Sequence, residues 1–266
     1  MTRTPATAPE RSRRLTVSVV IPVKDDAVLL ERCLSALRTQ TRPPDEVIVV
    51  DNASTDATAA VAASARAIVF TCTEPGIPAA SSHGYDRACG DLILRLDADC
   101  VPADTWVQTV TAAFESHPDV DAFTAGARFI DGPKPLRTPL AAAYLLAYAT
   151  ATSPALGHLP LFGSNLAMRR SVWEDVSSSV HRHDPHMHDD LDLAFHIGRR
   201  HRIRYLRGAA MGMSMRPFRS GQSIAQRIVR GFRTVASHWP WDFPPIRWVY
   251  LLWRTRAGRR RSVTVN

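Results

Sequence analysis

The order of apolar patterns in the first half of the chain restricts its fold more than any other feature. Short β-branched runs such as Val17–Ile21 alternate with longer segments in which leucines recur at helical spacing, as in Ala27–Gln40. Strands separated by helices form a mostly parallel sheet with helices on both faces. We therefore predict an α/β fold with strands at 17–21, 46–50, 67–70, 91–96 and 120–130, and helices at 27–40 and 104–116, with two more ending near 66 and 88.

The pattern weakens from about residue 140 onward. It predicts helices near 141–151, 171–176 and 190–200 and a strand at 203–206, but it assigns them no order. We divide the chain into three parts. These are a disordered lead-in at 1–14, a main domain at 15–210, and an extension rich in basic and aromatic residues at 211–266.

The length of 266 residues, 45% of them hydrophobic, suffices for one large domain with its own core. This composition excludes a wholly disordered chain, a collagen-like chain and a disulfide-stapled mini-protein. The four cysteines have no metal-binding spacing and residues 1–14 lack the apolar stretch of an export signal, so we expect reduced thiols and a cytoplasmic location. The uncharged run 139–157 has the length of a membrane span, but its threonines, tyrosines and prolines favour a packed helix.

Basic residues concentrate at the C-terminal end. Residues 196–266 include sixteen arginines and a single acid, Asp242, and tryptophans are interleaved with the arginines. The pattern fits a peripheral contact of residues 227–261 with an anionic membrane, and fits equally a C-terminal segment packed on the core with solvated arginines. No nucleic-acid-binding motif accompanies the basic stretch, so we do not expect nucleic acid as a partner.

Two carboxylates follow the strand predicted at 91–96. Asp97 and Asp99 are two residues apart, so in an extended segment both side chains point to the same side. Two converging carboxylates bind a hard divalent cation, which keeps open positions for diphosphate oxygens. An isolated tripeptide of this kind is more often a solvated turn. Its place after a strand of an α/β pattern favours a metal site, because ligands bind beyond the carboxyl ends of such strands.

Two further acidic positions carry candidate roles. Asp51 ends the second predicted strand, where its carboxylate either accepts hydrogen bonds from a base or ribose or caps the next helix. In the stretch His188–Leu193 one aspartate is expected to cap a helix, and an ionised aspartate there can act as a general base toward a sugar hydroxyl. Four histidines crowd into residues 181–188, and we favour a solvated loop over a metal ligand for them.

Four segments taken in order, VSVVIPVKDD, EVIVVDNASTD, GDLILRLDAD and HDDLDL, resemble the family 2 glycosyltransferases of the GT-A fold. The resemblance covers about residues 17–200. It implies transfer of a sugar from a nucleoside diphosphate sugar to an acceptor hydroxyl, with inversion at the anomeric carbon and Mn²⁺ or Mg²⁺ on the diphosphate. It also implies a nucleotide-binding half at about 15–130 and an acceptor half at about 131–210. The expected acceptor is a glycan or a lipid-linked molecule, as in cell-envelope polysaccharide synthesis.

The resemblance assigns roles to individual residues. Asp99 matches the usual metal ligand, Asp97 lies nearer the ribose and the metal's waters, and Asp190 matches the base that deprotonates the acceptor. Asp192 supports the helix. The donor site that the resemblance implies lies near the first two strand ends, at Pro22, Val23, Asp25, Asp51, Asn52 and Ser54.

The chain departs from the family pattern at three places. Ala80–Ser82 replaces an Ala-Arg-Asn sequence, which removes an arginine expected near the donor. Cys100 follows the paired aspartates where an acid is common, and Asp189 replaces a glutamate. None of these changes removes an essential role, so we expect an active enzyme.

Two other functions fit parts of the pattern. A nucleotidyltransferase also combines an α/β sheet with a carboxylate-bound metal, but it would carry a glycine-rich basic segment where this chain has PVKDD. A non-catalytic nucleotide-sugar-binding protein would keep the donor pocket, although the presence of Asp97, Asp99 and Asp190 argues against it.

Overall fold

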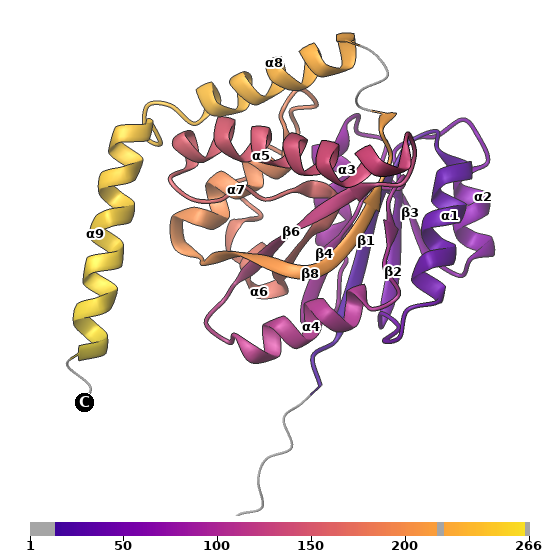
Figure 1. Cartoon of the computed structure of the whole chain (residues 1–266), viewed down its shortest axis with the longest axis horizontal. Helices are drawn as coiled ribbons and strands as arrows, with labels where there is room; N and C mark the ends of the chain where they lie inside the picture. Colours follow the sequence, from indigo (N-terminus) through magenta and orange to yellow (C-terminus); the bar gives the residue numbers. More distant parts are fainter. Residues whose placement is uncertain (1–13, 217–220, 264–266) are drawn as a thin grey trace, which may run out of the picture.

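The computed structural model describes residues 14–216 and 221–263, without the side chains of 221–223 and 255–263. The lead-in expected at 1–14 therefore lies outside the described residues except for Arg14, whose side chain is 3.5 Å from Asp45. The predicted α/β class is confirmed (Figure 1). The strands are β1 (Val17–Val23), β2 (Glu46–Asp51), β3 (Ile68–Thr71), β4 (Leu92–Arg95), β5 (Val101–Pro102), β6 (Ala122–Phe129), β7 (Leu166–Arg169) and β8 (Ile203–Met213).

The helices of the first half lie close to their predicted positions. Over the whole described chain, the α-helices are α1 (Ala27–Arg38), α2 (Thr58–Ser64), α3 (Ile77–Tyr85), α4 (Trp106–Ser116), α5 (Arg137–Leu156), α6 (Arg170–Val176), α7 (Asp189–Arg200), α8 (Gly221–Ser237) and α9 (Pro244–Val263). The uncharged run at 139–157 forms most of α5, which packs against β6 as the packed-helix prediction requires. Among the described residues, no helix combines the length and apolarity needed to cross a bilayer.

The sheet is parallel on one side and mixed on the other. Its order is β3-β2-β1-β4-β7-β6-β8-β5, and the pairs from β3 to β4 are all parallel, as predicted. β7 then pairs antiparallel with both β4 and β6. The sequence did not indicate β7, because four residues between two helical segments give too short a pattern to separate a strand from a loop.

β8 is longer than the sequence predicts. It pairs with β6 beyond Leu206 through a register shift and continues to Met213. Gly208, with a φ of 85°, and the alanines after it interrupt the apolar alternation on which the prediction relied. The strand therefore crosses residue 210, where we divided the main domain from the C-terminal extension.

Side-chain alternation along the buried strands builds a core on each face of the sheet. Val19 and Ile21 of β1 face α1 and α4, whereas Val20 packs with α3, α6 and α7. Because β1, β2 and β4 are parallel, the loops that follow them meet at one edge of the sheet, where α/β proteins bind ligands.

The C-terminal helices lie outside these two layers. Figure 1 shows α8 running over α5 and α9 turning down along the side of the domain far from α1. The buried guanidinium of Arg247 holds α9 in place. It donates to the backbone oxygens of Leu156 (2.6 Å) and Phe195 (2.9 Å) and to the Asp242 carboxylate (2.8 Å). The first of these bonds satisfies the carbonyl group of Leu156 at the end of α5, which a helix cannot pair internally, and the second ties α9 to the middle of α7.

Candidate active site

A buried arginine organises the candidate site. Arg95, at the end of β4, donates from Nη2 to Asp97 Oδ1 across 2.8 Å, and its Nη1 lies 3.0 Å from Asp189 Oδ2. Burial disfavours the charged guanidinium, but Asp189 and Asp97 outweigh it and raise the pKa of Arg95. Arg95 thus joins the aspartates after β4 to those at the start of α7.

Asp97 and Asp99 lie close together, as the sequence predicts, and the thiol of Cys100 lies beside them. Asp97 Oδ2 accepts a 2.5 Å hydrogen bond from Ser164 Oγ, and Asp99 Oδ2 is 3.2 Å from Arg216 Nη2. Burial and then the charges of both aspartates raise the pKa of Cys100 well above its usual range, so its thiol is not an available ligand for a hard cation.

The two aspartates fit a divalent cation by their chemistry. Burial and the neighbouring Asp97 raise the pKa of Asp99, while Arg216 opposes the shift. A divalent cation offsets such repulsion, and carboxylate oxygens are the ligands that Mg²⁺ and Mn²⁺ prefer. Arg216 also contacts Asp26 at 2.5 Å, so its guanidinium supplies positive charge between the loops after β1 and β4.

Asp190 lies across the cleft and has three partners. The backbone N–H of Gly163 donates to Oδ2 (2.7 Å), the Tyr148 hydroxyl donates to Oδ1 (3.2 Å), and His188 Nδ1 lies 2.5 Å from Oδ1. Burial opposes ionisation, but His188, Arg95 and the Gly163 amide together hold the pKa of Asp190 well below its usual range. The carboxylate is therefore ionised at neutral pH.

One cleft of about 210 Å³ joins these groups. Its charged lining residues come from three parts of the chain, Arg95 and Asp97 at the end of β4, His188, Asp189 and Asp190 at the start of α7, and Arg227 and Arg230 of α8. Three carboxylates and four basic groups therefore face one space. Such a mixture suits a charged ligand bound together with a cation.

The predicted donor residues lie at the ends of β1 and β2. Pro22 and Val23 are buried in β1, and Asp51 is 6% exposed at the end of β2. Asp51 Oδ1 accepts the backbone N–H of Ser54 (3.0 Å) in the loop before α2. The capping role considered for Asp51 is therefore wrong, because α2 begins only at Thr58 and its N-cap residue is an alanine. The second carboxylate oxygen of Asp51 accepts no hydrogen bond from the part of the chain that the structure describes.

The remaining donor-site residues tie loops together. Asn52 donates to the backbone oxygens of Cys72 (2.9 Å) and Glu74 (2.6 Å). The Asp25 backbone N–H donates to Ser54 Oγ (2.9 Å), and Asp25 Oδ1 accepts the backbone N–H of Thr55 (2.6 Å). The pKa of the exposed Asp25 is lowered mainly by this Thr55 hydrogen bond. These bonds fix the loops that surround Asp51.

The histidines of the 181–188 stretch do not form one group. His183 contacts Glu74 (2.6 Å), His188 contacts Asp190, and His186 is exposed. His181 instead lies 2.7 Å from Asp192, the residue for which we expected a helix-supporting role.

Several site residues were not predicted from the sequence. Arg95 could have been, since an arginine inside the apolar run LILRL needs a buried partner. No sequence pattern indicates Tyr148, Gly163, Ser164 or Arg216, because each lies far along the chain from the aspartate that it contacts.

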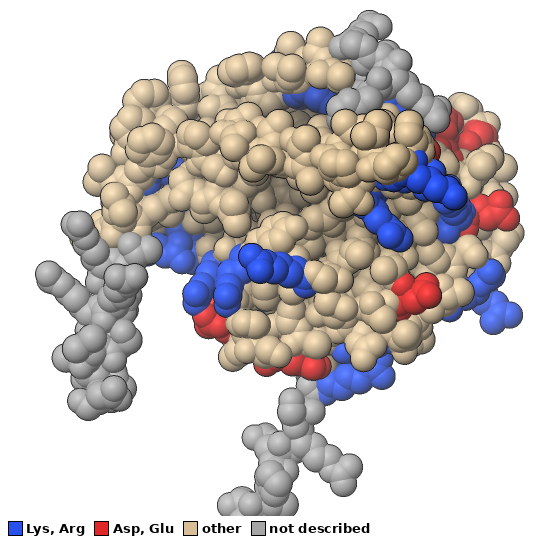
Figure 2. Space-filling view, viewed as in Figure 1, with Lys and Arg blue, Asp and Glu red and all other residues tan. Residues whose placement is uncertain are grey.

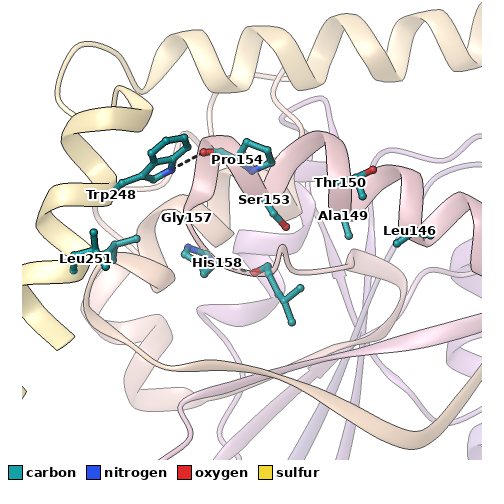
Figure 3. Close-up of a pocket in the computed structure, with 11 residues that line it drawn as sticks. Leu146, Ala149, Thr150, Ser153, Pro154, Gly157, His158, Trp248 and Leu251 are labelled. Carbon is teal, nitrogen blue, oxygen red and sulfur yellow. Dashed lines mark hydrogen bonds between the residues drawn. The ribbon is translucent and has the colours of Figure 1, made fainter. Parts of the chain in front are cut away.

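Two apolar hollows adjoin the C-terminal helices. One, of about 380 Å³, lies between α5 and α8 and shares Tyr148, His188 and Arg227 with the cleft. The other, of about 990 Å³, lies between α5 and α9, where Trp248 donates to the Pro154 oxygen (2.8 Å) and Leu251 faces His158 (Figure 3). In Figure 2 the upper surface over α5 and α8 is largely uncharged, and the acidic groups in view lie toward the lower and right-hand rim.

A family model described as "Glycosyl transferase family 2" matches residues 18–176, a range that includes Asp51, Asp97 and Asp99 and ends before Asp190. Glycosyltransferase AglE of Haloferax volcanii is 35% identical over 100 residues, which are 35% of this chain and 33% of that protein. Undecaprenyl-phosphate 4-deoxy-4-formamido-L-arabinose transferase of Pectobacterium carotovorum is 37% identical over 94 residues, 31% of this chain and 28% of that protein. The chain thus matches about a third of the length of these relatives.

Among solved structures, the fold resembles the mannosyltransferase PcManGT from Pyrobaculum calidifontis in complex with GDP-Man and Mn²⁺. The TM-score is 0.59 at 24% identity, over 92% of this chain and 71% of that one.

Proposed function

This chain belongs to glycosyl transferase family 2, and we propose that it transfers a sugar from a nucleoside diphosphate sugar to an acceptor hydroxyl, with inversion at the anomeric carbon. The observation that carries the proposal is the placement of Asp97 and Asp190 on one cleft, joined through Arg95 and Asp189. An inverting transfer needs one base on the side of the acceptor and charge neutralisation on the side of the leaving group.

The donor side is formed by the loops after β1, β2 and β4. The free carboxylate oxygen of Asp51 accepts from the base or ribose, and Asp99, with Asp97 beside it, holds Mn²⁺ or Mg²⁺. A cation held there would supply positive charge against the departing diphosphate. Arg227 and Arg230 of α8 line the cleft together with Asp97 and add positive charge there.

The acceptor side is built around Asp190. Its ionised carboxylate takes the proton of the attacking hydroxyl, and the Gly163 amide and Tyr148 hydroxyl fix its orientation. A hydroxyl activated there attacks from the side opposite the diphosphate, so one displacement inverts the anomeric centre.

Substitution of the base tests the reaction. Asp190→Asn keeps the size of the side chain and is expected to lower kcat by about 10²- to 10⁴-fold, with the thermal shift produced by nucleoside diphosphate and Mn²⁺ preserved. UDP, GDP, TDP and CDP are screened, and the product anomer is assigned by NMR. Asp175→Asn, at a 63% exposed side chain of α6, serves as the matched control. Full turnover by Asp190→Asn would refute the assignment.

We propose a lipid-linked acceptor, presented at a membrane surface to α8 and α9. Phe232 is 75% exposed, Trp241 79% and Trp253 67%, and arginines lie between them. Aromatic and basic side chains together favour the headgroup region of an anionic bilayer. The apolar hollow between α5 and α8 leads to His188 at the cleft, a path suited to the chain of a lipid.

Vesicle binding tests the membrane contact. Co-sedimentation with phosphatidylglycerol vesicles is expected for the wild type and is expected to fall about tenfold or more for the double variant Phe232→Ser, Trp241→Ser, since each loses its apolar insertion. Val28→Ser provides the control, because Val28 is 79% exposed on α1, at the other side of the domain (Figure 1). Equal binding by all three proteins would exclude Phe232 and Trp241 as the contact.

A further inference from the structure

A second group of metal-binding side chains lies outside the cleft, on the far side of α7. Its members share one centre, the carboxylate of Asp192, and we call them the three-histidine cluster: His181, Asp192, His196 and His238. They come from the loop after α6, from α7 and from the end of α8. One potential ligand atom of each lies within 4.8 Å of those of the others.

The contacts within the three-histidine cluster converge on a single oxygen. Asp192 Oδ1 lies 2.7 Å from His181 Nδ1, 3.2 Å from His238 Nε2 and 3.5 Å from His196 Nε2. The other oxygen, Oδ2, accepts the backbone N–H of His181 (2.8 Å), which fixes the carboxylate plane. The side chains of Asp192 and His238 are only 5% and 3% exposed, so water has little access to the centre.

The hydrogen bonding of His238 leaves one nitrogen facing the carboxylate without a bond. His238 Nδ1 lies 2.8 Å from the Thr234 oxygen, to which it can only donate, so in the neutral ring Nε2 carries a lone pair. That lone pair faces Asp192 Oδ1. Nε2 of His238 and Nε2 of His196 are both buried and form no hydrogen bond among the described residues. Two acceptors facing each other in a buried space require a cation between them.

A proton on His238 alone meets this requirement and gives a neutral pair with Asp192, because neutral His181 and His196 can each donate from the ring nitrogen that faces the carboxylate. One divalent metal ion with three neutral imidazoles also meets it and gives the facing lone pair of every ring a partner. The ring centroids lie 5.1–5.8 Å apart, so one ion can contact all three rings. Three nitrogens and one carboxylate oxygen are ligands that suit Zn²⁺, whereas Mg²⁺ and Ca²⁺ prefer oxygen alone.

We propose that the three-histidine cluster is a structural zinc site that fastens the end of α8 to α7. Ligands at about 2.0–2.1 Å from a tetrahedral Zn²⁺ lie about 3.3 Å from one another, so the observed spacing needs shifts of about an ångström or less. Four protein ligands leave no open position, which is typical of structural rather than catalytic zinc. A metal-bound imidazole usually donates its other ring N–H to a carbonyl or carboxylate, and the backbone oxygen of Thr234 is such an acceptor for His238 Nδ1.

The proposed zinc site is connected to the cleft by α8, which ends beside the site and also lines the cleft. Asp192 is two residues beyond Asp190 on α7, and Arg227 and Arg230 of α8 line the cleft. Zinc at the three-histidine cluster would therefore hold these arginines at the cleft. It is separate from the cation expected at Asp97 and Asp99.

Metal analysis of the full-length protein tests the proposal. Protein equilibrated with Zn²⁺ and dialysed without chelator is expected to hold about one zinc per chain by elemental analysis, with a nitrogen and oxygen shell near 2.0 Å by X-ray absorption. Removal of zinc with a strong chelator is expected to lower Tm, and Zn²⁺ but not Mg²⁺ to restore it. A zinc-free protein under these conditions, or a shell containing sulfur, would overturn the proposal.

Variants locate the ion. His196→Gln and His238→Gln are each expected to lower the affinity for zinc at least tenfold, whereas His183→Gln and His186→Gln, from the same histidine-rich stretch, keep it. Asp99→Asn is expected to retain the zinc while losing the response to Mn²⁺. If zinc were lost with Asp99→Asn and kept with His238→Gln, the ion would belong to the cleft and the proposal would be wrong.

Discussion

Gly163 packs so closely against the guanidinium of Arg95 that a methyl group at position 163 would lie 2.0 Å from Arg95 Nη1. The same methyl group would lie 3.1 Å from Asp190 Oδ2, which accepts the Gly163 amide. A glycine therefore stands where the backbone approaches both charged groups, and no side chain fits without displacing one of them.

Gly163→Ala is expected to move Arg95 and Asp190 out of place and to lower kcat/KM by about 10²-fold, since a displacement of about 1 Å is enough for such a loss. Steady-state kinetics measures the effect. The control is Gly231→Ala in α8, where an added Cβ meets no atom within 4 Å. Equal kinetics for the two variants would contradict the packing described for Gly163.

Arg95→Met removes the buried positive charge between Asp97 and Asp189 and leaves both carboxylates without this partner, Asp189 at a side chain only 16% exposed and Asp97 at one 36% exposed. The free energy of unfolding is expected to fall by about 3–5 kcal/mol. Urea denaturation monitored by fluorescence gives this value. Arg38→Met, at an exposed position of α1, is the matched control and is expected to change stability by less than about 0.5 kcal/mol. A loss below about 1 kcal/mol for Arg95→Met would show that the buried ion pairs are dispensable.

Arg247→Met is expected to release α9 from the domain, because the carbonyl groups of Leu156 and Phe195 lose their donor. Hydrogen exchange of the amides in α9 should speed up at least tenfold while that of β1 stays unchanged. Arg207→Met, at an exposed residue of β8, is the comparison variant. Unchanged exchange in α9 would mean that Trp248 and the apolar contacts suffice to hold the helix.

His158 makes stability depend on pH. Burial, with the charges of Arg247 and Arg254, lowers its pKa from 6.5 to about 4. As pH falls below 6.5 the unfolded chain gains a proton that the folded protein does not take up until about pH 4, so stability falls across this range, by at most about 3 kcal/mol.

His158→Gln is expected to remove this part of the acid sensitivity, so that wild type and variant converge in stability as pH falls from 6.5 toward 4. Urea unfolding at several pH values measures the difference. The exposed His186 supplies the control variant, His186→Gln. Parallel curves for the wild type and His158→Gln would contradict the lowered pKa.

The sequence was sufficient for the parts of the protein that depend on local pattern. Apolar strands alternating with amphipathic helices predicted the parallel half of the sheet, and aspartates directly after strands were predicted at its carboxyl edge. Asp97, Asp99 and Asp190 were identified because each follows a recognisable strand or begins a helix. β7 and the far half of β8 were missed, since their four residues and their glycine and alanines carry no clear period.

What surrounds those aspartates was decided by the tertiary structure alone. Tyr148, Ser164 and Arg216 contact these aspartates from positions 42 to 117 residues away in the sequence. The histidines of one short stretch separate in the same way, His188 to the cleft and His181 to Asp192. Local sequence fixes which side chains stand at the ends of strands and helices, because periodicity acts over a few residues. Which distant side chains neutralise them depends on how the layers pack, and no local pattern carries that information.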